Sequence, residues 1–182
     1  MYPLTTTTAR IDACNPCYLR RQRAAKLLNI TEPSNEPITY AQLLDVLGLD
    51  DALWCCRAEP DLAPIWRRYA VWCARQVQHL MTDQRSLDVL DVAERHASGA
   101  ATDEELDAAW AAARAAAMAA AGTAAGTAAN AARAAAGTAA WAADAAGTAA
   151  GTAAWAAAAA GTAAWEAQVA AFRRLVTTGA LD

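Results

Sequence analysis

Five cysteines and two histidines are the residues of this chain whose side chains most readily bind metals or attack substrates. Cys14 and Cys17 form a CxxC pair, the spacing that supplies two ligands to a structural zinc site. The other candidate ligands form no second paired motif; they are Cys55, Cys56, Cys73, His79 and His96. We therefore expect no bound metal, and we predict that Cys14 and Cys17 are thiols in a turn.

Catalytic chemistry finds little support in the rest of the pattern. A redox CxxC would lie beside a βαβ unit, which the sequence lacks, and a cysteine nucleophile would need a base such as His79 or His96. The carboxylates of Asp50, Asp51 and residues 103–105 stand where helices are expected to begin, so capping accounts for them. No Gly-rich phosphate loop, HExxH or GxSxG motif is present. The sequence predicts a protein that is not an enzyme and holds no cofactor.

Basic residues gather at two places, which are the candidate sites for contact with a partner protein. The net charge of −4 and the pI of about 5.1 give no general attraction to nucleic acid or to an anionic membrane, so we expect neither as a partner. Solvated helix faces without a binding role are the alternative interpretation. The candidate residues are Arg20, Arg21, Arg23, Trp66, Arg67 and Arg68.

The elements that would position these residues are helices. Residues 1–10, with four successive threonines, are expected to be a disordered tail. Residues 11–100 predict an N-terminal helical domain, in which Thr39 caps one helix, Gly48 stops it and Asp50 caps the next. The apolar residues that follow recur at helical spacing, and no strand is predicted.

The second half of the chain is an alanine-rich tract interrupted by Gly-Thr pairs and tryptophans. The sequence "TDEE" at 102–105 is a capping box, so a helix is expected to begin there. One straight rod would be about 100 Å long, and each glycine would cost it up to about 1 kcal/mol relative to alanine. We therefore favour helices folded back on themselves over a rod, with corners at Gly137, Gly147 and Gly161.

Alanine and glycine allow helices to approach closely, and tryptophan supplies the few large contacts. The residues expected to pack these helices are Gly122, Gly126, Gly137, Gly147, Gly151, Gly161, Trp110, Trp141, Trp155 and Trp165. The predicted fold class is all-α: an N-terminal helical bundle followed by long, close-packed Ala/Gly-rich helices. Residues 101–178 are expected to pack as one unit with residues 11–100.

Threonines of the tract suggest a second possible function. On one ideal helix they fall within an arc of about 120°; they are Thr123, Thr127, Thr138, Thr148, Thr152 and Thr162. Such a stripe resembles the threonine rows of type I fish antifreeze protein. Ice binding, or self-assembly into a homo-oligomer through the Ala/Gly face, is therefore the alternative function.

Several segments resemble a family regarded as immunity proteins of polymorphic toxin systems, found in bacterial and phage genomes. The segments are "DACNPC", "GLDDALWCCRA", "IWRRYAVWCARQVQHLM", "LDVAERHASGAATDEEL" and "AAFRRLV". The resemblance implies an all-helical protein with an Ala-rich C-terminal tract that binds and neutralises a toxin, without an active site of its own. The odd number of cysteines and the lack of a signal peptide or an apolar membrane span predict a cytoplasmic protein.

Overall fold

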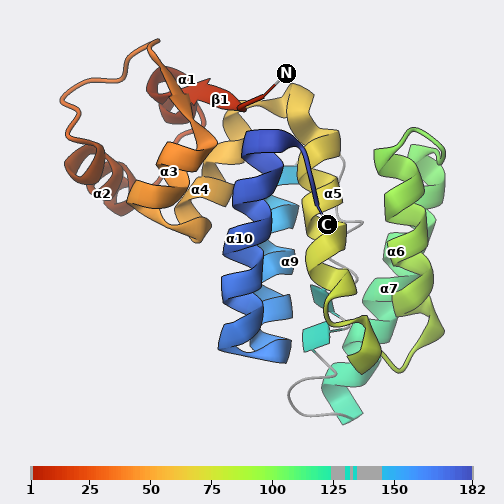
Figure 1. Ribbon diagram of the computed structural model, residues 1–182. Coiled ribbons are helices and arrows are strands. Elements are labelled where there is room, and N and C mark those ends of the chain that lie inside the picture. The colour runs from red at the N-terminus through yellow and green to blue at the C-terminus, as the bar shows by residue number, and fades with distance from the viewer. Residues whose placement is uncertain (1, 124–129, 132, 135–144, 182) are drawn as a thin grey trace.

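The computed structural model describes residues 2–123, 130–131, 133–134 and 145–181 (Figure 1). The molecule is 75% helical with one small two-stranded sheet, so the predicted all-α class is correct. Three short 3₁₀ turns, η1 Cys56–Ala58, η2 Pro60–Leu62 and η3 Gln78–Leu80, connect helices. The helices are α1 Thr8–Ala13, α2 Tyr18–Leu28, α3 Tyr40–Leu47, α4 Leu49–Cys55, α5 Ala63–Arg75, α6 Gln84–Ala97, α7 Asp103–Thr123, α9 Ala145–Ala160 and α10 Thr162–Thr178.

Residues 4–10 are part of the fold, so the prediction of a disordered tail over 1–10 is wrong for these residues. Strand β1 (Thr5–Thr7) pairs antiparallel with β2 (Pro37–Thr39), a sheet that the sequence analysis did not predict. Leu4 is buried, its amide donates to the carbonyl of Val176 at 2.8 Å, and its carbonyl accepts from the amide of Tyr40 at 3.1 Å. Strands of three residues are too short to show the alternation of polar and apolar residues that predicts a strand. The two strands are also distant in sequence, so the sequence alone does not indicate that they pair.

Helices α3 and α4 meet at Gly48. Thr39 and Gln42 form the capping box at the start of α3, and Gly48, with φ of 84°, ends that helix. Gly48 also precedes the first residue of α4, so the prediction that Asp50 caps this helix is wrong. Asp50 and Asp51 instead occupy the first turn of α4, where carboxylates complement the positive end of the helix dipole.

An aromatic cluster at the centre of the fold joins α3, α5 and α10. The ring of Trp66 lies 5.0 Å from that of Tyr40 and 6.3 Å from that of Phe172, between ring centroids. Tyr69 meets the edge of Phe172 at 5.3 Å, and its hydroxyl donates to the carbonyl of Gln168 at 3.1 Å. The core therefore contains residues from both the predicted N-terminal domain and the predicted C-terminal unit.

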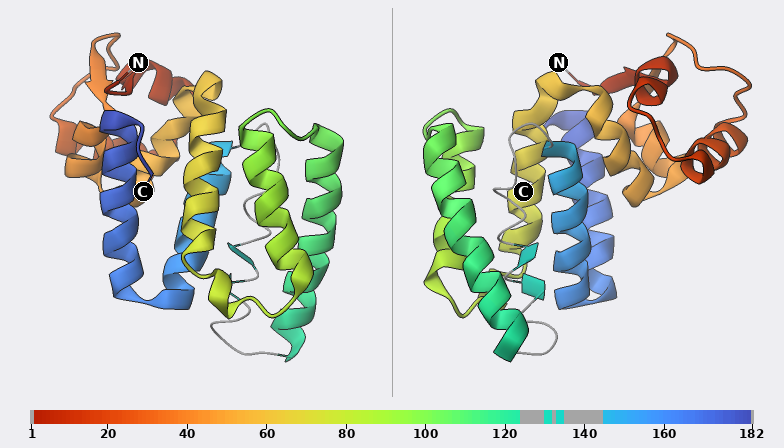
Figure 2. Two further views of the ribbon diagram at one scale, coloured as in Figure 1. Left: turned by 45° about the vertical axis from the view of Figure 1, so that its right-hand side comes forward. Right: turned by 180° about the vertical axis from the view of Figure 1, so that it is seen from behind.

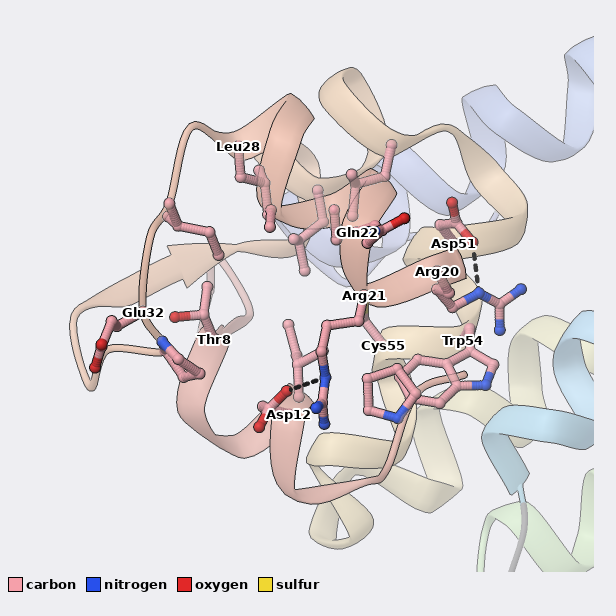
Figure 3. Close-up of a pocket in the computed structure, with 18 of the residues that line it drawn as sticks. Thr8, Asp12, Arg20, Arg21, Gln22, Leu28, Glu32, Asp51, Trp54 and Cys55 are labelled. Atoms are coloured by element: carbon pink, nitrogen blue, oxygen red, sulfur yellow. Dashed lines mark ion pairs between the residues drawn. The ribbon is translucent and has the colours of Figure 1, made fainter. Parts of the chain in front are cut away.

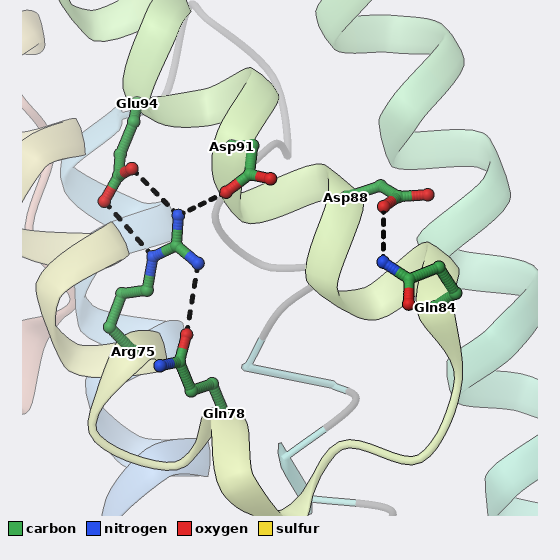
Figure 4. Close-up of polar contacts among 6 residues, drawn as sticks. All are labelled: Arg75, Gln78, Gln84, Asp88, Asp91 and Glu94. Carbon is green, nitrogen blue, oxygen red and sulfur yellow. Dashed lines mark hydrogen bonds and ion pairs between the residues drawn. The ribbon is translucent and has the colours of Figure 1, made fainter.

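Helices α6 and α7 form an antiparallel pair at one end of the molecule (Figure 2). The predicted capping box is present: the amide of Thr102 donates to Oε2 of Glu105 at 2.9 Å, and the amide of Glu105 donates to Oγ1 of Thr102 at 3.2 Å. Helix α7 buries Leu106 and Ala113 against its neighbours. Four polar contacts of Arg75 tie the end of α5 to α6 and η3 (Figure 4).

The alanine-rich tract is folded back, as predicted, and is not one rod. Helices α9 and α10 form a hairpin whose corner is Gly161, with φ of 84° and ψ of −166°, and α9 lies against α5 (Figure 2). The predicted corner at Gly147 is wrong, because α9 continues through Gly147 and Gly151. Gly122 lies in the last turn of α7.

Three of the predicted packing residues, Gly126, Gly137 and Trp141, lie outside the described residues. Of the other tryptophans, Trp110 and Trp165 are half-buried and pack against the core. Trp155 is 42% exposed, and its ring faces the guanidinium of Arg133 at 5.0 Å. Trp155 is therefore not the buried contact that its position in the repeat predicts.

The predicted threonine stripe is not displayed at Thr152. This side chain is fully buried in α9, and its hydroxyl has no hydrogen-bond partner among the residues that the structure describes. A flat row of exposed threonines through this position is therefore absent. None of the described helices has the length and apolarity needed to cross a membrane.

Candidate functional site

Helix α2 stands apart from the close-packed body of the protein. It begins at Tyr18 and ends at Leu28, where Asn29 follows as the C-cap with φ of 53°, and it contains no buried residue (Figure 1). Tyr18 and Leu19 are 71% and 75% exposed, and Leu27 is exposed on the same helix. Exposed apolar side chains gathered on one element are typical of an interaction surface.

Charged side chains attach α2 to the rest of the fold. Nε of Arg20 lies 2.7 Å from Oδ1 of Asp51, and Nη1 of Arg23 lies 3.1 Å from Oδ2 of the same carboxylate. The Asp51 side chain is 7% exposed, so one buried carboxylate holds two guanidinium groups. Nε of Arg21 lies 2.8 Å from Oδ1 of Asp12 in α1 (Figure 3).

A groove of about 300 Å³ lies between α2 and the elements behind it (Figure 3). Its walls come from α1, α2, the segment 30–33, α3 and α4. Most of the wall is hydrocarbon, and its charged lining residues are Asp12, Arg20, Arg21, Glu32 and Asp51. The apolar side chains that line it are Ile11, Pro16, Ala24, Ala25, Leu28, Ile30, Pro33, Leu43, Leu47 and Trp54.

Trp54 and Tyr18 are the aromatic residues among those that line the groove. The guanidinium carbon of Arg20 lies 5.1 Å from the ring centroid of Trp54 and that of Arg57 lies 5.5 Å away. Both distances are within the range of cation–π attraction. Trp54 therefore helps to hold Arg20 at the groove in addition to the carboxylate of Asp51.

Two of the thiols near the groove, Cys14 and Cys55, are poor nucleophiles. Burial, with a smaller contribution from the negative charge of Asp51, raises the pKa of Cys55 to about 12. Burial also raises the pKa of Cys14, against the opposing effect of Arg57 and Arg10. Cys17 is exposed at the start of α2. Nucleophilic chemistry needs the thiolate, and burial holds Cys14 and Cys55 in the thiol form.

No three His, Cys, Asp or Glu side chains of the described part of the chain form a group that could hold a metal ion. His96 Nε2 lies 2.8 Å from Oδ1 of Asp103, which joins the end of α6 to the start of α7. His79 lies in η3. Neither histidine lies on an element next in sequence to the CxxC pair of Cys14 and Cys17.

The structure separates the two predicted basic clusters. Arg20 and Arg21 line the groove, whereas Arg23 does not line it and pairs with Asp51 from the same helix. Trp66 and Arg67 are 1% and 2% exposed, so the prediction that they contact a partner is wrong for this conformation. Trp66 is central to the core, and its Nε1 donates to the carbonyl of Glu59 at 3.4 Å. Burial lowers the pKa of Arg67, while Asp103 opposes the shift.

Arg68, the last of these residues, is exposed on α5. The sequence analysis missed Asp51 and Trp54, which hold the arginines, and Tyr18 and Leu19, which supply the exposed apolar surface. The adjacent pair Tyr18-Leu19 was a usable signal, because two neighbouring large residues on a helix face directions about 100° apart and a narrow buried stripe seldom takes both.

Replacing Asp51 by asparagine is expected to loosen α2. The change removes the charge that holds Arg20 and Arg23, and we expect the free energy of unfolding to fall by about 1–3 kcal/mol. The loss stays in this range because both guanidinium groups are partly exposed and water can solvate them after the change. Amide hydrogen exchange should accelerate in α2 far more than in α5. Asp50→Asn is the control, because Asp50 is the exposed neighbour in the same turn; equal losses in the two variants would contradict the role of Asp51.

No family model, no curated protein and no solved structure matches this chain. The features that bear on function are therefore the all-α architecture, the exposed side chains of α2 and the groove.

Proposed function

We propose that this chain is a non-enzymatic binding protein whose α2 helix contacts another protein. The single observation that carries the proposal is the exposure of Tyr18 and Leu19 on a helix that buries none of its residues. Tyrosine and arginine are enriched among the residues that dominate binding energy at protein interfaces. We use the name α2 surface for Tyr18, Leu19, Arg21, Lys26 and Leu27.

The chemistry of the α2 surface favours an acidic partner. Helix α2 carries three arginines and one lysine and no acidic residue, although the whole chain has a net charge of −4. Because Asp51 and Asp12 pair with the three arginines, this patch is only weakly positive, and its attraction to a negatively charged surface is correspondingly small. The resemblance to immunity proteins supports a toxin as that partner, neutralised by occlusion. The five cysteines are free, which fits a reducing compartment such as the cytoplasm.

The test compares three forms of the chain: wild type, Tyr18→Ala/Leu19→Ala, and Met118→Ala. Met118 is 68% exposed on α7, so it is a matched loss of exposed apolar surface elsewhere. Proteins captured from the native lysate by wild type are purified, and their affinities for the three chains are measured by calorimetry. We expect the double variant to weaken binding at least about tenfold, equivalent to about 1.4 kcal/mol, and Met118→Ala to leave it unchanged.

Inhibition of the purified partner's own activity at a one-to-one ratio would support the immunity role. Equal affinities for all three chains would place the interface elsewhere and overturn the proposal. Light scattering of the free chain distinguishes the self-assembly alternative: a homo-oligomer that the double variant dissociates would make a second copy the occupant of the α2 surface.

A further inference from the structure

We infer that α2 is a hinged arm, which detaches from the body of the protein as one unit when the ion pairs on its inner side are broken. The arm is α2 itself, Tyr18–Leu28, and the latch that holds it is the buried carboxylate of Asp51 in α4 (Figure 3). The motion takes place in the free chain and needs no partner, so it goes beyond the binding role proposed for the α2 surface. Three features of the structure support it: the backbone at the two ends of α2, the nature of its contacts, and the groove behind it.

The backbone on both sides of α2 has the character of a hinge. Asn15, three residues before the helix, has φ of 52°, and Asn29, directly after it, has φ of 53°. Within the described ranges they are the two non-glycine residues with positive φ. The left-handed conformation is costly for a residue with a side chain, and asparagine is among those that tolerate it best. Hinges are commonly a few residues at the ends of elements that absorb a change of φ and ψ, so rotation at Asn15 and Asn29 moves α2 as a unit.

The contacts that hold α2 in place are mainly polar. The guanidinium groups of Arg20 and Arg23 lie 2.7 and 3.1 Å from the two oxygens of Asp51. No residue of α2 is buried, and the two that pack against the core, Ala24 and Leu28, are half-buried. The side chains of Arg20 and Arg23 are 31% and 60% exposed, so salt weakens their attraction to Asp51. Buried apolar packing, as in α5, carries no charge to be screened.

The groove behind α2 lowers the cost of detachment. Because an open space of about 300 Å³ separates much of α2 from α3 and α4, little close apolar packing is lost when the helix leaves. A helix of 11 residues is too short to be stable by itself, so the amides of α2 exchange with solvent once its contacts are lost. Detachment also uncovers the wall of the groove, which includes Leu43, Leu47 and Cys55. The latch at Asp51 therefore controls access to this wall.

Amide hydrogen exchange of the full chain at about 0.01 M and about 0.5 M sodium chloride tests the latch. We expect the amides of α2 to exchange about fivefold faster at the higher salt concentration, and all at a similar rate, because the helix opens as one unit. The amides of α5 should change by less than about twofold, because buried apolar packing holds this helix. Exchange of α2 that is the same at both salt concentrations, or that follows the exchange of α5, would overturn the inference.

Two pairs of variants assign the latch and the hinge. Asp51→Asn should remove most of the response of α2 to salt, whereas Asp50→Asn, at the exposed neighbour in the same turn, should keep it. Asn29→Ala places alanine in the left-handed conformation and should speed the exchange of α2 about fivefold at low salt. Asn35→Ala, at an exposed asparagine whose φ is not positive, should not change it. Equal responses within a pair would overturn the assignment of Asp51 as latch or of Asn29 as hinge.

Thiol labelling distinguishes detachment of α2 from unwinding of the helix in place. Cys55 is 4% exposed and lines the groove, whereas Cys73 is buried in α5 and does not line it. N-Ethylmaleimide, with the modified cysteines identified by mass spectrometry, should therefore label Cys55 at least about tenfold faster than Cys73, and the rate at Cys55 should rise with salt as the exchange of α2 does. Equal labelling rates for the two thiols at both salt concentrations would mean that Cys55 is reached only by global unfolding, and would overturn the inference. These measurements use no protein partner, so their failure would leave the proposal for the α2 surface untouched.

Discussion

Replacing Trp66 by alanine is expected to lower the free energy of unfolding by about 3–5 kcal/mol. The indole is 1% exposed and lies between the rings of Tyr40 in α3 and Phe172 in α10. Alanine would leave a cavity where elements from the two ends of the sequence meet. A domain of this size is stable by about 5–15 kcal/mol, so this single change would remove a large part of its stability.

Urea-induced unfolding monitored by far-UV circular dichroism measures the effect of Trp66→Ala. Trp155→Ala is the matched control, because Trp155 is 42% exposed and its described contact is with Arg133. We expect it to cost no more than about 1 kcal/mol, the range of an exposed cation–π pair. Similar losses for the two tryptophans would contradict the placement of Trp66 at the centre of the core.

Alkaline pH is expected to destabilise this protein steeply through three buried thiols. Burial raises the pKa of Cys55 and of Cys73 to about 12, and it raises the pKa of Cys56 well above its ordinary value. In the unfolded chain thiols ionise near pH 8.5. Above that pH the unfolded state loses protons that the folded state retains, so stability is present below about pH 8.5 and is lost progressively toward pH 12.

The expected loss is about 1.4 kcal/mol per pH unit for each thiol, or about 4 kcal/mol per unit for three of them above roughly pH 9. Urea unfolding at intervals between pH 8 and pH 10.5 gives the number of protons released on unfolding. Cys73→Ala should reduce that number by one, because it removes one of the three buried thiols. An unchanged proton release in Cys73→Ala would show that this thiol ionises as readily in the folded protein.

Features determined by neighbouring residues could be predicted from the sequence. The N-cap at Thr39, the capping box at Thr102, the stop at Gly48 and the corner at Gly161 each depend on a few adjacent residues, and all four are present. The hairpin of α9 and α10 follows from the corner at Gly161, because a helix that meets a left-handed glycine must change direction.

Features that depend on distant residues could not be predicted in the same way. Strand β1 pairs with a segment about thirty residues away, and nothing near Thr5–Thr7 indicates it. Arg67 is polar and beside Arg68, yet the packing of α5 buries the first and exposes the second. The candidate groove was missed for the same reason, because Asp51 becomes the anchor of α2 only when α4 packs beside it.

Gly161 has a further consequence for an alanine-rich chain. Because most positions of α9 carry the same methyl group, sliding this helix by one turn along α5 would exchange one alanine for another and change the buried hydrocarbon little. Such helices lack the distinct side chains that normally lock two surfaces in one alignment. The corner at Gly161, followed four residues later by the bulky Trp165, limits the distance that α9 can slide. The turn at this one glycine thus fixes the alignment of α9 along α5, which the many alanines of α9 fix only weakly.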